Sequence, residues 1–334
     1  MESKLLRDKI TIFGSGAFGT AMAYLLSKKN NYICIYGIDE DEVNDILNNH
    51  KNSKIFEKIL PSSITATTDM KEALKDAKII MIATPSFAVR DLLKRIVENL
   101  DHQIYIINLS KGYDLEKNES LSSLIYESIP SKFNLGVIKL SGPSYASEII
   151  RDEPTIFNFA SLKKEVFEKL NKYFNIEKIK LIYTSELEGV ELLSVLKNVY
   201  AIVLGINKGL GYGKNAEALL FYQILEEMKL VLKTLKVREE LAYTVSGLWD
   251  LYLTGTSRTS RNFNSGFLIG ENNKVNKEIF DTSKTTEGII SLNAMNNFLI
   301  KNKLHLLSFE LLYKIIYEKS NPKEAFKIFY QTYN

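Results

Sequence analysis

The chain has 334 residues, 45% of them hydrophobic and 25% charged, which is the composition of a globular protein long enough for two domains. Its 43 basic and 40 acidic residues are interspersed and leave a net charge of +3, which excludes the polyelectrolyte surface of a nonspecific nucleic-acid binder. The single cysteine excludes an internal disulfide, and the 3 histidines are scattered, so we predict no metal site.

The chain start and the hydropathy predict a cytoplasmic protein. Residues 1–9 lack the apolar core of a signal peptide, and we find no stretch of 18 apolar residues elsewhere. Cys34 lies in the apolar run Tyr32–Tyr36, so we expect a buried core thiol. We therefore expect no membrane insertion.

Short apolar, β-branched runs alternate with amphipathic stretches from Lys9 to about Ser185, a pattern typical of βαβ units and a parallel sheet. The predicted strands are Ile10–Phe13, Tyr32–Tyr36, Ile79–Ala83, Ile104–Leu109, Gly136–Leu140, Ile156–Ala160 and Lys180–Tyr183. The predicted helices between them are Thr20–Lys28, Glu40–Asn48, Ala88–Asn99, Glu119–Ile129 and Lys163–Phe174.

After Ser185 the pattern changes to long helical stretches. We predict an α/β fold with an N-terminal Rossmann-type, mostly parallel sheet domain (residues 1–187) and a C-terminal all-helical domain (residues 188–334). The predicted helices of the second domain are Glu188–Ile206, Ala216–Leu235, Lys284–Lys301 and Leu306–Glu318.

A glycine-rich turn follows the first predicted strand. Its sequence is Gly14-Ser15-Gly16-Ala17-Phe18-Gly19, and a helix opens directly after it. This is the dinucleotide fingerprint in the strand-turn-helix context that it requires. Gly14 permits the tight turn, Gly16 lets the backbone approach a pyrophosphate, and Gly19 allows close packing of helix and strand.

Asp39 lies at the end of the second strand, twenty residues beyond Gly19, where an acidic side chain accepts hydrogen bonds from the adenosine ribose. Such a residue disfavours a 2′-phosphate, which favours NAD over NADP, although Lys28 and Lys29 are cations that could approach a phosphate. The alternative for Asp39 is a helix N-cap, and both roles can hold together.

Further along the chain, ten collinear motifs resemble the bacterial-type NAD(P)-dependent glycerol-3-phosphate dehydrogenases and span most of the sequence. They are the glycine turn with Thr20-Ala21, Ala83-Thr84-Pro85-Ser86, Leu109-Ser110-Lys111-Gly112, Leu140-Ser141-Gly142-Pro143-Ser144-Tyr145-Ala146, Gly189-Val190-Glu191-Leu192, Leu196-Lys197-Asn198-Val199, Gly209 to Asn215, Leu253 to Ser257, Ser260-Arg261-Asn262 and Thr286-Glu287-Gly288.

The resemblance implies roles position by position. Lys197 matches the family's catalytic proton donor and acceptor, and Lys111 matches a lysine that faces both substrate and nicotinamide. The residues matching substrate contacts are Gly142, Ser144, Asp250, Ser260, Arg261 and Asn262, and those matching cofactor contacts are Ala146, Arg261 and Glu287.

The sequence departs from the family pattern after the second strand. Where the family often carries an arginine, this chain has Ile38 in the segment Tyr36-Gly37-Ile38, and an isoleucine cannot bind a 2′-phosphate. The family's Asn-x-x-Tyr-Leu-Pro segment has only a looser counterpart in Asn52–Pro61, and a family cysteine is Gly255 here.

Lysine suits the chemistry of ketone reduction, because hydride transfer creates alkoxide character that a proton donor must neutralise. Lys197 lies in the run Val190–Ile206, which is apolar on nearly every face, so we expect burial to lower the pKa of Lys197. Helical spacing places Glu191, Ser194 and Asn198 on one stripe, with Lys197 on its flank. The alternative is an ordinary lysine that extends its ammonium to solvent.

A phosphorylated substrate also needs an anion site. Residues 254–262 combine hydroxyls, backbone amides and the guanidinium groups of Arg258 and Arg261, of which we favour Arg261. Asp250 is expected either to accept a hydrogen bond from a substrate hydroxyl or to orient Lys197. The alternatives are a solvated loop with a helix cap, and a plain cap carboxylate for Asp250.

We therefore predict an enzyme that reduces dihydroxyacetone phosphate to glycerol 3-phosphate, using NAD or NADP with a preference for NAD. The resemblance implies that the product supplies phospholipid synthesis. The predicted partner is a small phosphorylated substrate, with no nucleic acid, and a homodimer is left open. The alternatives are a β-hydroxyacid dehydrogenase or ketopantoate reductase, which handle carboxylates, and a non-catalytic nicotinamide sensor.

Overall fold

The computed structural model describes residues 6–30, 32–114, 116–117, 119–276 and 286–332. They form two compact units, of which the first comprises Met1–Ser110 and Ser120–Glu188 and the second Lys111–Glu119 and Gly189–Asn334. The chain start at residues 1–5 and the first two residues of the predicted helix Lys284–Lys301 lie outside the described residues.

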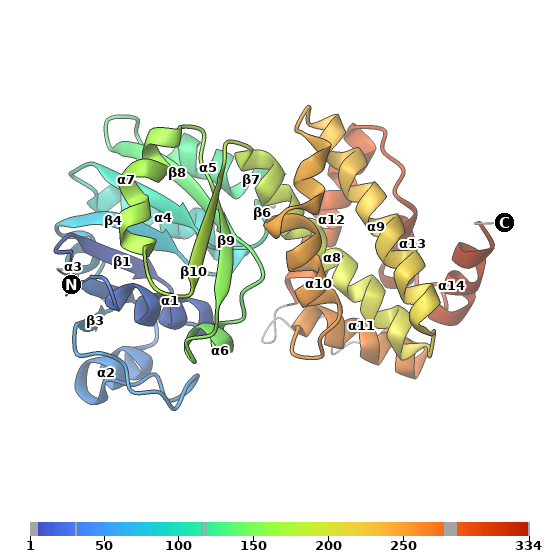
Figure 1. The fold of residues 1–334 in the computed structure, drawn as a ribbon, viewed down its shortest axis with the longest axis horizontal. Helices are drawn as coiled ribbons and strands as arrows, with labels where there is room; N and C mark the ends of the chain where they lie inside the picture. The colour runs from blue at the N-terminus through green and yellow to red at the C-terminus, as the bar shows by residue number, and fades with distance from the viewer. Residues whose placement is uncertain (1–5, 31, 115, 118, 277–285, 333–334) are drawn as a thin grey trace. The chain divides into compact units, whose positions relative to one another are not determined.

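The first unit is built on an eight-stranded sheet with the strand order β10-β9-β8-β5-β4-β1-β2-β3 (Figure 1). Neighbouring strands are parallel except β8 and β9, which pair antiparallel. The strands are β1 (Lys9–Phe13), β2 (Ile33–Tyr36), β3 (Ile64–Thr67), β4 (Ala77–Ile82), β5 (Ile104–Asn108), β8 (Asn134–Ser141), β9 (Thr155–Ala160) and β10 (Ile179–Thr184). The short strands β6 (Tyr113–Asp114) and β7 (Glu119–Ser120) pair separately.

Helices cover both faces of this sheet, because successive strand residues point to opposite sides and both sides are apolar. On β4, for example, Met81 belongs to one buried cluster and Ile80 to the other. The first cluster includes residues of α1 (Ala17–Ser27), α2 (Glu40–Asn49), α6 (Ala146–Ile149) and α7 (Lys164–Phe174). The second includes residues of α3 (Met70–Leu74), α4 (Val89–Asn99) and α5 (Leu121–Ser128) and lies near the turn η1 (Ser86–Ala88).

The predicted fold class is confirmed, and every strand predicted from the sequence is found. The sequence reading missed β3 and α3, because the run Ile64–Thr67 has only four residues and half of them are threonine. Cys34 is buried at 4% exposure, as predicted for a core thiol. The central order β3-β2-β1-β4-β5 is that of a Rossmann sheet, which puts the glycine turn after β1 at the point where the strand order reverses.

Apart from the segment 111–119, the described residues of the second unit lie mainly in helices. Its elements are α8 (Leu187–Gly209), which starts at the unit boundary, α9 (Lys214–Thr234), the turns η2 (Glu239–Tyr243) and η3 (Val245–Trp249), α10 (Asp250–Gly255), α11 (Arg261–Asn272), α12 (Glu287–Lys301), α13 (Leu307–Ile316) and α14 (Pro322–Gln331). Among the described helices, α8 is long and apolar enough to cross a membrane by length and composition, and its apolar window is entirely buried in the fold.

Glycines allow α8 and α11 to pack at very short range. A Cβ placed on Gly205 of α8 would lie 2.1 Å from the backbone oxygen of Phe263, and one on Gly266 of α11 would lie 2.1 Å from the backbone oxygen of Ile202. Only hydrogen atoms fit at such separations. The crossing therefore fixes how closely the residues of these two helices approach one another.

A buried carboxylate ties three helices of the second unit together. Glu227 of α9 accepts hydrogen bonds from the hydroxyl of Tyr200 on α8 at 2.9 Å and from the backbone amide of Ser308 on α13 at 2.7 Å. Burial raises the pKa of Glu227, and these hydrogen bonds oppose that shift. The carboxylate thus supplies an acceptor to an amide in the first turn of α13.

We predict that Gly266→Ala destabilises the protein by about 1–3 kcal/mol, because the added methyl group must push two helix backbones apart. Urea unfolding measures the change in the free energy of unfolding. Gly213→Ala is the matched control, since a Cβ there meets nothing within 4 Å. Equal effects of the two substitutions would contradict the close helix crossing.

Candidate active site

The three glycines of the turn 14–19 have different steric surroundings. Gly14 has φ +124°, and a Cβ there would meet the backbone oxygen of Ala83 at 2.9 Å. A Cβ on Gly19 would lie 2.0 Å from the backbone oxygen of Gly14. At Gly16, by contrast, a Cβ would meet nothing within 4 Å. The fold alone therefore requires Gly14 and Gly19 but not Gly16.

The turn is also held by side-chain hydrogen bonds. The backbone oxygen of Ser15 accepts from the hydroxyl of Thr20 at 2.9 Å and from the amide of the buried Asn52 at 2.8 Å, and the Ser15 hydroxyl donates to Glu42. Ala17 is exposed and Phe18 half-buried in the first turn of α1. Asn52 was given no role in the sequence reading, because its distance along the chain hides this contact.

Asp39 is the N-cap of α2, one of the two roles weighed from the sequence. Its Oδ1 accepts from the amides of Asp41 and Glu42 at 3.0 and 3.1 Å. Its Oδ2 pairs with the ammonium of Lys54 at 2.5 Å, and that hydrogen bond lowers the pKa of Asp39. Lys28, a cation proposed to approach a phosphate here, instead pairs with Asp152 and lies over the ring of Tyr24.

Three further predicted residues follow β8. The hydroxyl of Ser144 donates to the backbone oxygen of Gly142 at 3.0 Å, and Ala146 begins α6. Lys139 of β8, which the sequence reading treated only as part of a strand, is buried at 1% exposure and donates from its ammonium to the backbone oxygen of Ser110.

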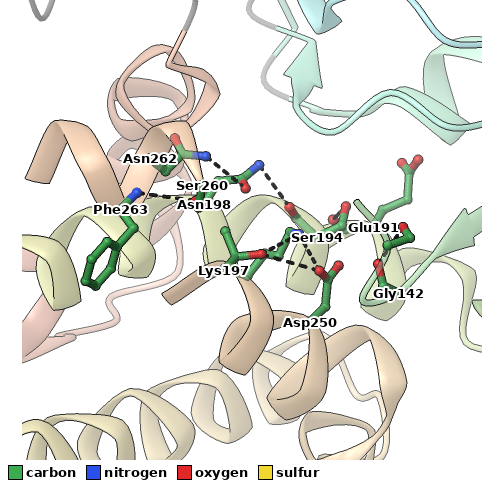
Figure 2. A network of polar contacts seen from close by, with 11 residues as sticks. Gly142, Glu191, Ser194, Lys197, Asn198, Asp250, Ser260, Asn262 and Phe263 are labelled. Atoms are coloured by element: carbon green, nitrogen blue, oxygen red, sulfur yellow. Dashed lines mark hydrogen bonds and ion pairs between the residues drawn. The ribbon is translucent and has the colours of Figure 1, made fainter. Parts of the chain in front are cut away.

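In the second unit, Lys197 of α8 and Asp250 of α10 form a buried ion pair. The Lys197 ammonium lies 2.5 Å from Asp250 Oδ1 and 3.0 Å from the hydroxyl of Thr254, and the side chains of Lys197 and Asp250 are 3% and 1% exposed (Figure 2). The predicted burial of Lys197 is confirmed. Thr254 was predicted as part of the anion site, and its contact with Lys197 was not foreseen.

Burial lowers the pKa of Lys197 to about 7, because the ammonium is removed from water. The charge of Asp250 opposes this shift, whereas the nearby charge of Lys111 adds to it. Asp250 therefore stabilises the ammonium and Lys111 the neutral amine. A lysine poised in this way can both donate and accept a proton near neutral pH.

Asp250 keeps one acceptor open. Its Oδ1 is occupied by Lys197, while Oδ2 is buried and has no hydrogen-bond partner among the described residues. A buried carboxylate oxygen without a donor is costly, so this atom is suited to accept a hydroxyl from a bound molecule.

Asn198 and Asn262 connect the lysine helix to two other helices. Asn262 of α11 donates to the amide oxygen of Asn198 at 3.1 Å (Figure 2). It also accepts from the backbone amide of Gly288 on α12 at 3.0 Å. Glu287, the residue before Gly288, is the first residue of α12. Asn262, predicted as a substrate contact, thus also holds the start of α12 against α8.

The predicted anion segment 254–262 ends at a helix N-terminus. Ser260 is the N-cap of α11, where its hydroxyl accepts from the amide of Phe263 at 3.3 Å. Arg258 is engaged, since its guanidinium lies 3.8 Å from the ring centroid of Phe267 and donates to Asn264 at 2.9 Å. Arg261 is exposed in the first turn of α11. A helix N-terminus with an exposed arginine is suited to bind an anion.

The sequence matches family models over most of its length. Residues 9–167 match the model described as the N-terminus of NAD-dependent glycerol-3-phosphate dehydrogenase, and residues 186–327 match the one described as its C-terminus. The chain belongs to this family. The membership predicted from ten collinear motifs is thereby confirmed.

Individual proteins of the family resemble the chain along its length. The glycerol-3-phosphate dehydrogenase [NAD(P)+] of Clostridium botulinum (strain Alaska E43 / Type E3) is 33% identical over 319 residues, which cover 95% of this chain and 96% of the relative. That of Streptococcus uberis is 33% identical over 320 residues, covering 95% and 94%. The crystal structure of glycerol-3-phosphate dehydrogenase from Coxiella burnetii superimposes with a TM-score of 0.88 at 26% identity, covering 96% of this chain and 97% of that one.

Membership of this family makes the chain an oxidoreductase that depends on NAD or NADP. It decides against the carboxylate-handling dehydrogenases and the non-catalytic sensor considered from the sequence. Among the described residues no group of three or more histidine, cysteine, aspartate or glutamate side chains could hold a metal ion.

We predict that Gly16→Ala lowers the affinity for NADH by at least about tenfold while leaving the melting temperature unchanged. The methyl group has open space in the fold but would stand where the backbone must approach a pyrophosphate. Calorimetric titration and thermal unfolding provide the two readouts, with Gly213→Ala as the control. An unchanged NADH affinity would show that the open space at residue 16 has another purpose.

Proposed function

We propose that the chain catalyses the reversible NAD(P)H-dependent reduction of dihydroxyacetone phosphate to sn-glycerol 3-phosphate, which supplies phospholipid synthesis. The observation that supports this most directly is the buried ammonium of Lys197, held by Asp250 and Thr254 with its pKa lowered to about 7. Such a group meets the central need of ketone reduction, a proton donor that also works as a base in the reverse direction.

We assign the dinucleotide to residues 1–187 and the substrate and the catalytic lysine to residues 188–334. In the first segment the backbone of residues 14–19 binds the pyrophosphate and Asp39 binds the adenosine ribose. Two observations support this assignment. The open space at Gly16 lets a ligand approach the backbone amides of the turn, and Asp39 lies at the N-cap of α2, where its carboxylate can accept a hydroxyl. Ala146, Arg261 and Glu287 complete the proposed cofactor contacts.

When bound, the reduced nicotinamide supplies the hydride that attacks the C2 carbon of the ketone. The Lys197 ammonium donates a proton to the developing C2 alkoxide, and in the reverse reaction the neutral amine removes it. Asp250 orients the Lys197 ammonium through Oδ1 and accepts a substrate hydroxyl through Oδ2. Lys111 contributes a second positive charge near Lys197, which stabilises the alkoxide and keeps the pKa of Lys197 low.

The substrate phosphate is assigned to the N-terminus of α11. Ser260 shapes this end as its cap, the helix dipole favours an anion there, and Arg261 offers a forked guanidinium. Gly142, Ser144 and Asn262 are the other proposed substrate contacts. Since Asn262 bonds to Asn198, the phosphate end is tied to the helix that carries the catalytic lysine.

We propose a preference for NAD over NADP. Ile38, at the position where the family often has arginine, is 83% exposed and carries no charge, and Asp39 is an anion at the ribose end. Both features disfavour the added negative charge of a 2′-phosphate.

We predict that Lys197→Met lowers kcat for dihydroxyacetone phosphate reduction by about 10²–10⁴-fold and leaves NADH affinity nearly unchanged, because only the proton transfer is lost. Steady-state assays and NADH titration measure the two effects. Lys208→Met, an exposed lysine of the same helix, is the control. Full activity of Lys197→Met would remove this residue from the mechanism.

The titration of Lys197 predicts how the activity depends on pH. Reduction requires the ammonium, so kcat/KM falls as the pH rises through about 7, whereas oxidation requires the amine and rises over the same range. Asp250→Asn removes the anion that favours the ammonium and moves both midpoints to lower pH. Profiles that keep their midpoints in that variant would contradict the ion pair's role.

We predict that Ile38→Arg raises the ratio of kcat/KM for NADPH to that for NADH by about tenfold or more, because it adds a cation at the ribose end. Ile38→Gln, which adds length without charge, is the control. An unaltered ratio in Ile38→Arg would discredit the assignment of this position to cofactor choice.

A further inference from the structure

We propose that Lys54 is an exchangeable counter-ion at the ribose end of the dinucleotide site, pairing with Asp39 when NAD is bound and with the 2′-phosphate when NADP is bound. This inference rests on the proposed dinucleotide site. On this proposal, Lys54 determines the affinity of the chain for NADP, since no arginine follows β2.

The geometry at Asp39 separates two tasks between its oxygens. Oδ1 is committed to the helix cap, where it accepts two backbone amides of α2. Oδ2 is the oxygen that pairs with Lys54, and it has a further lone pair for a ribose hydroxyl. A lysine at this position therefore lies beside the atom expected to recognise the 2′ position of the ribose.

The backbone that carries Lys54 is anchored on both sides. Asn52 donates to the backbone oxygen of Ser15 in the glycine turn at 2.8 Å, and the amide of Ser53 donates to Asp45 of α2 at 2.8 Å. The amide of Phe56 then bonds back to the Asn52 carbonyl at 2.9 Å. The side chain of Lys54 can change its rotamer, but its point of attachment stays next to the site.

The pair is easily exchanged because it is exposed. The side chains of Lys54 and Asp39 are 50% and 41% exposed, and ion pairs in such settings contribute little net stability. The ammonium can leave Asp39 for a phosphate, which carries about two negative charges near neutral pH. Asp39 raises the pKa of Lys54, so the cation persists over the working range.

The acidic surroundings of Asp39 would repel a 2′-phosphate unless a cation such as Lys54 lies nearby. The helix α2 starts with three acidic residues in its first turn, directly after Asp39. A 2′-phosphate would meet this group of carboxylates, and Ile38 cannot offset it. Of the two cations suggested by sequence proximity, Lys28 does not fill the role, since it pairs with Asp152. Lys58, in the same segment as Lys54, likewise lies 3.9 Å from Asp152.

The test is calorimetric titration of the full chain with NADH and with NADPH, for wild type and Lys54→Met. We expect the NADPH affinity of Lys54→Met to fall about tenfold at low salt, because one charged contact with the 2′-phosphate is lost. The NADH affinity should change less than about twofold. Lys58→Met is the matched control, because its ammonium is paired elsewhere, and its affinity ratio should equal that of wild type.

A second comparison keeps the test decisive if wild type binds NADPH too weakly to measure. Asp39→Asn removes the repelling carboxylate and should strengthen NADPH binding, and adding Lys54→Met in that background should abolish the gain. Equal losses for NADH and NADPH in Lys54→Met would show that Lys54 only orients Asp39 and would overturn the proposal, as would no change in either. A wild-type chain that binds neither dinucleotide would contradict the proposed function itself.

Discussion

The burial of one ammonium group is the constraint on which the rest of the second unit depends. Lys197 is 3% exposed on a helix whose apolar window is wholly buried, and removing a cation from water is costly unless partners compensate. Asp250 and Thr254 supply that compensation only in part, so the pKa of Lys197 falls to about 7. The energetic cost of placing a lysine there and its ability to exchange a proton near neutral pH have the same origin.

The close packing of α8 against α11 fixes the position of the residues around the buried Lys197. Glycines at the crossing bring the backbones so close that a single methyl group would force them apart. The same contact allows Asn262 to reach Asn198, the neighbour of Lys197, and to hold the first turn of α12. The N-terminus of α11, to which we assign the substrate phosphate, and Lys197 of α8, which we propose as the proton donor, are therefore positioned by close main-chain packing.

The first unit shows how little of a binding turn is fixed by the fold. Gly14 and Gly19 are required by backbone contacts, while Gly16 has open space, so the fold alone does not explain its lack of a side chain, whereas the proposed approach of a pyrophosphate does. At the ribose end, Asp39 caps α2 and meets an exposed lysine from a different segment. On our proposal, cofactor preference depends on charges brought together by the loop 50–61 as well as on the residue that follows β2.

The sequence by itself determined the fold class, most strands of the sheet, several of the helices, the glycine turn and the family, because each depends on periodicity or on motifs contiguous in the chain. It also determined that Lys197 is buried, since its helix is apolar on nearly every face. Only the tertiary structure decided that Thr254 contacts Lys197, that Asn52 holds the glycine turn and that Lys54 pairs with Asp39. These partners lie on separate segments, and local sequence patterns do not report which side chains meet once those segments pack.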